Sequence, residues 1–167
     1  MSARTLLSLL ALCCNLICLP AWAIDVGEQA PDLTAKTLDG QAFDLHKQLG
    51  QVVIVNFWAS WCEPCREEMP AMEAYYQQHK SEGLKIIAIS MDEPEDDQMV
   101  HKVMAHYSYP AALQRDADFS GFGRVWRMPM TYVIDRQGVV RKDGSVGEPK
   151  IDLPLLDTLV TPLLTAH

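Results

Sequence analysis

Two cysteines separated by two residues are the part of this sequence best suited to chemistry. They stand in the segment Trp61-Cys62-Glu63-Pro64-Cys65. A thiolate attacks a disulfide to form a mixed disulfide, and a second thiol close by can then resolve it. A bond between two cysteines so near in sequence closes only a very small loop, so it constrains the unfolded chain little. The spacing therefore favours a redox-active pair over a structural staple.

The elements around the pair predict how it is positioned. The β-branched and aromatic run Val52 to Trp58 is typical of a strand buried on both faces. A helical stretch follows, from about Cys62 to Lys80. The unpaired N–H groups and the dipole at a helix N-terminus favour an anion, which makes Cys62 the nucleophilic thiolate. Cys65 lies on the same side of the helix one turn deeper, so we expect it to resolve the mixed disulfide.

The rest of the chain predicts an α/β fold with a mixed sheet. A strand–helix–strand unit followed by an antiparallel pair produces such a sheet, with helices on its faces. The expected elements are a hairpin over Leu33 to Leu45, a strand over Leu84 to Ser90, a helix over Asp96 to Tyr107, a loop and helical turn over 114–126, a hairpin over Thr131 to Lys142 and a closing helix over 152–165.

The first 23 residues predict a signal peptide. Arg4 supplies a positive charge, Leu6 to Leu19 is almost entirely apolar, and Ala21-Trp22-Ala23 places small residues where a signal peptidase cuts. The apolar run is shorter than the roughly 18 residues that favour a membrane span. We therefore expect an exported, periplasmic protein with one domain over residues 24–167. An uncleaved leader that tethers the protein to the membrane is the alternative.

Composition and cysteine count exclude several classes of function. The 167 residues carry a net charge of -8 without basic clusters, which disfavours binding to nucleic acid or anionic membranes. Three of the five cysteines lie in the leader, so Cys62 and Cys65 are the two that remain after cleavage. A structural zinc site needs four ligands, and the chain has no second C-x-x-C to supply them. We expect no metal, no cofactor and a monomer.

The stretch from Asn56 to Pro70, NFWASWCEPCREEMP, resembles the active-site segment of the thioredoxin superfamily. It resembles more closely the bacterial periplasmic TlpA-like branch, which includes ResA and the cytochrome c maturation thioredoxins. The resemblance extends from Ala30 to about Gly147. It implies a thioredoxin-like mixed sheet flanked by helices, with an added N-terminal β-hairpin, and the activity of a protein dithiol–disulfide oxidoreductase.

The resemblance also implies further site residues. Pro129 matches the family's cis proline, which faces the cysteine pair, so Met128 and Pro129 are expected to bind substrate together with Trp61. Met130 follows this proline where the family commonly has Thr or Ser, which alters the expected substrate groove. Glu68 matches the glutamate that removes the proton of the second cysteine in the ResA-like branch. Its alternative is a solvated surface role, as expected for Glu67.

The direction of electron flow is expected to be reductive. The negative charge of Glu63 beside Cys62 disfavours the thiolate that strongly oxidising relatives stabilise. The resemblance implies disulfides at the haem-attachment cysteines of apocytochrome c as substrate, and a membrane thiol reductase of the DsbD or CcdA type as electron donor. Two alternatives remain open: a copper(I)-binding assembly thioredoxin, and a thiol peroxidase, because peroxiredoxins share the core fold.

Overall fold

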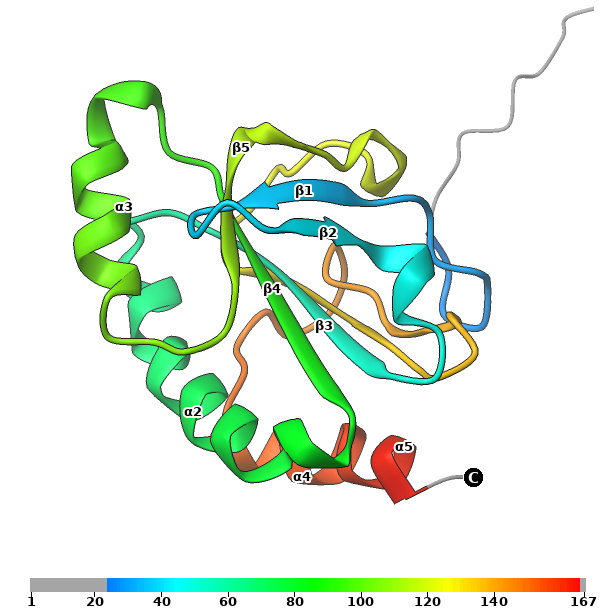
Figure 1. The fold of residues 1–167 in the computed structure, drawn as a ribbon. Coiled ribbons are helices and arrows are strands. Elements are labelled where there is room, and N and C mark those ends of the chain that lie inside the picture. The colour runs from blue at the N-terminus through cyan, green and yellow to red at the C-terminus, as the bar shows by residue number, and fades with distance from the viewer. Residues whose placement is uncertain (1–23, 166–167) are drawn as a thin grey trace, which may run out of the picture.

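Residues 24–165 are described by the computed structural model, and the predicted signal peptide of residues 1–23 lies outside them (Figure 1). Within this range seven strands form one sheet in the order β2-β1-β5-β4-β3-β6-β7. The strands are β1 (Thr34–Thr37), β2 (Ala42–Asp44), β3 (Val52–Trp58), β4 (Leu84–Ser90), β5 (Ala111–Asp118), β6 (Met130–Ile134) and β7 (Val140–Lys142). The α-helices are α2 (Glu63–His79), α3 (Asp97–Met104), α4 (Leu153–Leu159) and α5 (Thr161–Thr165).

The sheet is mixed, as predicted. Strands β3 and β4 pair in parallel along their whole length, from Val52 opposite Leu84 to Trp58 opposite Ser90. Strand β6 runs antiparallel beside β3, and β7 pairs antiparallel with β6. The predicted N-terminal hairpin is confirmed by the antiparallel pairing of β1 with β2. The expected α/β, thioredoxin-like architecture is therefore correct.

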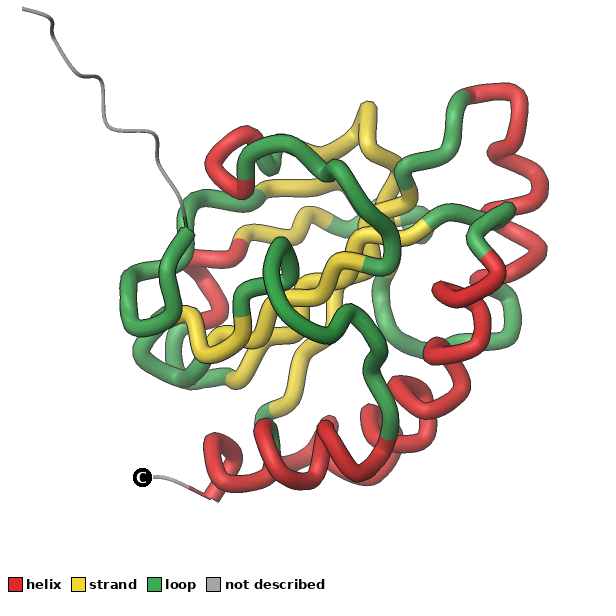
Figure 2. The backbone as a smooth tube through the Cα atoms, turned by 180° about the vertical axis from the view of Figure 1, so that it is seen from behind, coloured by secondary structure: helices red, strands yellow, loops and turns green. Residues whose placement is uncertain are grey.

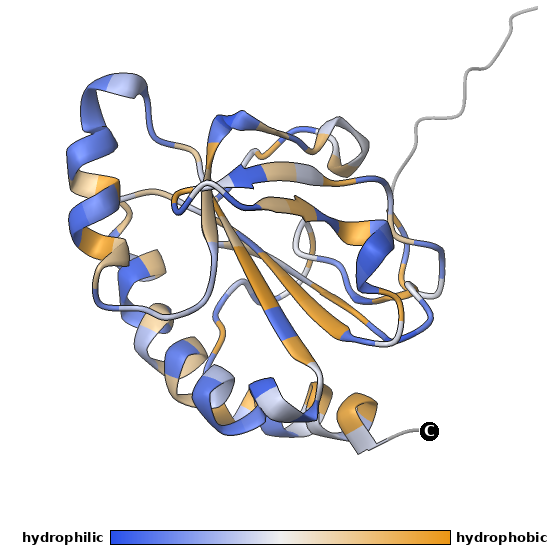
Figure 3. Cartoon of the chain, in the orientation of Figure 1, coloured by the Kyte–Doolittle hydropathy of each residue, from blue (hydrophilic) through white to orange (hydrophobic). Residues whose placement is uncertain are grey.

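Both faces of the central strands are covered, which explains their continuous apolar sequences. Alternate side chains of β3 point to opposite faces. Ile54 and Trp58 pack with residues of all four α-helices, which lie on the same face of the sheet (Figures 1 and 2). Val55 and Phe57 pack on the other face with the β1–β2 hairpin and the turn around Phe122. Figure 3 shows the apolar residues of β3 and β4 between these layers, while α3 is mostly hydrophilic.

The prediction of a loop over 114–126 was wrong for its first part. Residues Ala111–Asp118 form β5, which pairs in parallel with β4 and antiparallel with β1. The polar end of this strand pairs with β1 through its backbone while its charged side chains stay exposed. The strand therefore lacked an apolar pattern over half its length. The expected helical turn follows at Ser120–Phe122 as a 3-10 helix.

The predicted closing helix over 152–165 is divided into α4 and α5. Pro162 lies where a continuous helix would need a backbone N–H to reach the carbonyl four residues earlier, and proline has none. Pro154 falls in the first turn of α4, where proline is tolerated. None of the helices within residues 24–165 is long and apolar enough to cross a membrane.

Candidate active site

The cysteine pair lies where β3 passes into α2. Cys62 is the N-cap of α2, with extended backbone, and its Sγ accepts a hydrogen bond from the Cys65 N–H at 3.3 Å. A disulfide joins the two cysteines, whose Cα atoms are 5.3 Å apart. Glu63 and Pro64 form the first turn of the helix. The pair therefore occupies the helix N-terminus, where unpaired N–H groups and the dipole stabilise a thiolate.

The two sulfur-bearing residues differ in their access to solvent. Cys62 is 6% exposed and Cys65 is fully buried. Trp61, immediately before the pair, is 63% exposed although it is a large aromatic residue. Glu63 and Pro64 are also exposed. A protein substrate can therefore reach Cys62 past the exposed ring of Trp61, whereas Cys65 is enclosed by the protein.

The segment before β6 reaches the same end of the sheet. Met130 pairs with Phe57, so residues 128 and 129 lie beside the end of β3 from which the cysteine loop departs. Met128 packs against the core cluster that contains Cys62 and Cys65. The peptide bond between Met128 and Pro129 is cis, as the resemblance implies. The structure thus brings Met128 and Pro129 to the end of the sheet from which the cysteine loop departs, from a position more than 60 residues away in sequence.

Glu68 is buried one helical turn beyond Cys65. Its side chain is 2% exposed, whereas the neighbouring Glu67 is exposed. Glu68 Oε1 accepts a hydrogen bond from Asn56 Nδ2 at 3.0 Å, and Oε2 accepts one from the Ile151 N–H at 3.1 Å. Cys65 and Glu68 share a face of α2 because they are three residues apart. The carboxylate therefore lies inside the protein, on the side of the helix that carries Cys65.

Burial raises the pKa of Glu68 to about 7. Loss of solvent is the largest cause, because it disfavours the charged form. The hydrogen bonds from Ile151 and Asn56 and the charge of Lys142 act in the opposite direction without cancelling it. A carboxylate with this pKa can accept and release a proton near neutral pH, which is the property a general base needs.

Asn56 is a partner of Glu68 that the sequence reasoning missed. Its Nδ2 donates to Glu68 and also to Thr131 Oγ1, at 2.9 Å. Asn56 lies on the same, helix-facing side of β3 as Trp58, because residues two apart in a strand share a face. This period was the sequence signal that could have placed Asn56 opposite the active-site helix. The amide therefore links the glutamate to β6.

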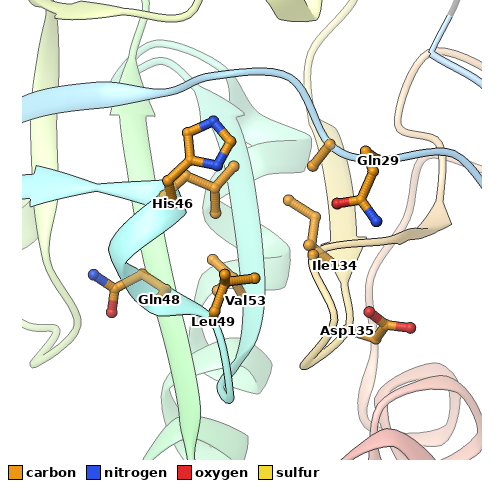
Figure 4. A pocket seen from close by; sticks show the side chains of 10 residues that line it. Gln29, His46, Gln48, Leu49, Val53, Ile134 and Asp135 are labelled. Atoms are coloured by element: carbon orange, nitrogen blue, oxygen red, sulfur yellow. The ribbon is translucent and has the colours of Figure 1, made fainter.

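Figure 4 shows a small hollow beside the start of β3, and neither cysteine lines it. It has a volume of about 20 Å³ and is lined by Gln29, Leu49, Val53 and Ile134 among others. Val53 stands near the start of β3, about 17 Å of strand away from Trp58. The hollow has room for about one water molecule and none for a substrate. Among residues 24–165, no group of three or more His, Cys, Asp or Glu side chains is placed to hold a metal ion.

Comparison with known proteins points to one family and one activity. The model of the AhpC/TSA family matches residues 26–143. The thiol-disulfide oxidoreductase ResA of Bacillus cereus is 33% identical over 119 residues, which cover 70% of this chain and 68% of ResA. The thioredoxin-like protein YneN of Bacillus subtilis is 34% identical over 78% of this chain and 81% of its own.

A solved structure described as a putative thiol:disulfide interchange protein DsbE, from Chlorobium tepidum, superimposes with a TM-score of 0.72. It is 30% identical in sequence and covers 85% of this chain and 99% of its own. The sequence relatives and this structure therefore agree on thiol–disulfide exchange within a thioredoxin-like fold.

Proposed function

Because the chain belongs to the AhpC/TSA family and is a ResA-like, thioredoxin-like thiol–disulfide oxidoreductase, we propose that it reduces protein disulfides in the periplasm. Cys62 is the attacking thiol, Cys65 the resolving thiol and Glu68 the base that serves Cys65. Trp61, Met128 and Pro129 form the surface on which the substrate lies. The burial of Glu68 behind Cys65 is the observation that carries this proposal.

The reaction passes two electrons from the reduced pair to the substrate. The Cys62 thiolate attacks one sulfur of the substrate disulfide, and the other substrate sulfur leaves as a thiolate. Cys65 then loses its proton to Glu68 and attacks Cys62, which forms the Cys62–Cys65 disulfide and releases the second substrate thiolate. The buried thiol of Cys65 needs a base to attack at neutral pH, and a carboxylate with a pKa of about 7 suits that task.

The charge beside the nucleophile supports the reductive direction. Glu63 follows Cys62 directly, and the motif places no Lys, Arg or His between the two cysteines. A negative charge disfavours the Cys62 thiolate and hence the reduced form, whereas a strongly oxidising protein stabilises that form. A reductant in an oxidising compartment needs a supply of electrons, for which we propose a membrane thiol reductase of the DsbD or CcdA type.

The substrate and location rest on the leader and on the family resemblance. We place the mature protein, residues 24–167, in the periplasm after cleavage behind Ala23. The substrate class is a disulfide between the haem-attachment cysteines of apocytochrome c, in a C-x-x-C-H segment. The exposed Trp61 beside Cys62 suits an extended peptide of this kind, because an aromatic ring supplies a large contact area.

The reduction potential of the Cys62–Cys65 pair tests the direction. We expect the mature protein, equilibrated with dithiothreitol, to have a potential near or below about -270 mV, and to reduce an oxidised C-x-x-C-H peptide. A potential near about -120 mV would identify an oxidant and refute the proposal. Copper(I) titration and turnover of hydrogen peroxide on the same sample separate the copper-binding and peroxidase alternatives from it.

A further inference from the structure

A buried carboxylate, that of Asp92, lies against the loop of residues 59–62 that leads into the cysteine pair. Asp92 follows the end of β4 and is 1% exposed. The backbone N–H of Ser60, two residues before Cys62, donates to its Oδ2 at 2.9 Å. The Ser60 hydroxyl donates to Oδ1 at 2.6 Å, and the Ser90 hydroxyl donates to Oδ2 at 2.6 Å. The loop before the nucleophile is therefore tied to the end of β4 through one side chain.

The oxygens of Asp92 accept hydrogen bonds from three groups, the N–H and hydroxyl of Ser60 and the hydroxyl of Ser90. All of these donors are neutral, and no Lys, Arg or His forms an ion pair with Asp92 in the described part of the chain. Its negative charge is thus held in place without being neutralised.

The turn that Asp92 holds is the turn that positions the nucleophile. The Cys62 N–H donates to the Ala59 carbonyl at 3.1 Å, which closes a tight turn over residues 59–62. The Met91 N–H donates to the Trp58 carbonyl at 2.8 Å, so the segments leaving β3 and β4 run together. Asp92 is therefore hydrogen-bonded to a residue of this turn, Ser60, that stands two residues before Cys62. Because Asp92 and Cys62 are both buried, solvent screens their interaction little.

We propose that Asp92 is a positioning residue for the disulfide exchange, which holds the loop before Cys62 through Ser60 and places a fixed negative charge behind the nucleophile. The N-terminus of α2 favours the Cys62 thiolate. The charge of Asp92 opposes this effect, which destabilises the reduced form and keeps the reduction potential low. The hydrogen bonds to Ser60 orient the Sγ atom of Cys62, whereas the charge of Asp92 lowers the reduction potential of the cysteine pair. Two variants can therefore separate the two effects.

This inference rests on the proposed function only in taking Cys62 as the attacking thiol. The test compares variants with the wild-type protein, so it does not depend on whether the absolute potential is that of a reductant. An oxidising wild-type potential would refute the reductive direction. The role of Asp92 would still be decided by the difference in potential between the wild type and the variant. Identical potentials in the wild type and Asp92→Asn would refute the charge effect of Asp92 and leave the direction untouched.

The charge effect is tested by Asp92→Asn, which keeps the shape and one acceptor oxygen. We expect its equilibrium constant with glutathione to shift at least threefold toward the reduced protein, about 15 mV upward in potential. Glu93→Gln is the matched control, because Glu93 is the next residue, loses the same charge and is exposed. Its potential should stay at the wild-type value. An unchanged potential in folded Asp92→Asn overturns the charge effect.

The positioning effect is tested by Ser60→Ala, which removes the hydroxyl bond and keeps the charge of Asp92. We expect at least a threefold slower alkylation of reduced Cys62 by iodoacetamide, with an unchanged potential. A wild-type alkylation rate overturns the positioning effect. Should Asp92→Asn not fold, Asp92→Ser removes the same charge with a smaller polar side chain. If neither folds, Asp92 is required for the fold, the charge effect is withdrawn, and only the positioning effect tested by Ser60→Ala is retained.

Discussion

The amide of Asn56 donates a hydrogen bond of 3.0 Å to the carboxylate of Glu68, from β3 to α2. Both side chains are buried, so the amide fixes the glutamate on the side of α2 that carries Cys65. A buried carboxylate in this position accounts for a pKa of about 7 and supports our proposal that Glu68, and not Glu67, is the base.

Replacement of Glu68 by Gln should slow the resolving step. The amide cannot accept a proton, so Cys65 loses its base, and we expect turnover to fall about a hundredfold at pH 7. The wild-type rate should also show an inflection near pH 7, the pKa of Glu68, that the variant lacks. The measurement is the rate at which the reduced protein reduces a disulfide peptide between pH 5 and 9.

The control for this variant is Glu67→Gln, because Glu67 is adjacent and exposed. It should keep the wild-type rate and the inflection. If Glu68→Gln kept the inflection near pH 7, another group would have to be the base, and the role proposed for Glu68 would be wrong.

The same glutamate should make folding stability depend on pH. Its pKa is raised from 4.5 to about 7 in the folded protein, which therefore binds this proton more tightly than the unfolded chain does. The contribution is complete below pH 4.5 and is lost as the pH rises through about 7. We expect the free energy of unfolding of the wild type to fall by about 3 kcal/mol relative to Glu68→Gln over this range.

Denaturant titrations of the oxidised proteins at several pH values measure this difference. The two proteins are compared by the slope of the free energy of unfolding against pH. Its absolute value is not compared, because the substitution also changes the hydrogen bonds from Asn56 and Ile151. Parallel slopes would mean that Glu68 does not change its protonation state in this range.

Replacement of Cys65 by Ala should trap the substrate on Cys62. Cys65 is fully buried, so the first bond to an incoming disulfide must form at Cys62. Without the resolving thiol, the mixed disulfide persists, and we expect turnover to fall about a hundredfold or more. Intact-mass analysis after incubation with a disulfide peptide should show the adduct. Cys62→Ala is the comparison, and an adduct on that variant would reverse the assigned order of attack.

Replacement of Trp61 by Ala should weaken the binding of peptides and leave the chemistry intact. Trp61 is 63% exposed, so its loss costs the fold little. We expect kcat/KM for a disulfide peptide to fall about fivefold, through KM, while the rate with dithiothreitol stays unchanged. Met99→Ala, which truncates an exposed side chain of α3, should change neither rate. Equal losses with peptide and dithiothreitol would mean that Trp61 supports the cysteines and not the substrate.

The sequence by itself determined the chemistry and the local frame of the site. The C-x-x-C spacing after an apolar strand placed the pair at a helix N-terminus, where α2 begins at Glu63. The strand over Leu84–Ser90 was predicted with its exact bounds. These features depend on residues near one another in the chain, through side-chain period and helix-start signals, so one segment suffices to predict each.

The tertiary structure decided which polar residues are enclosed and what they meet. Glu67 and Glu68 are adjacent and alike in type, and only the packing of α2 on the sheet buries the second. Asp92 stands beside an acidic exposed run, yet the parallel pairing of β3 and β4 brings it beneath Ser60. Pairing between distant strands and the direction of a helix face are set by the whole core, because burial is shared among many segments. No short stretch of sequence contains that information.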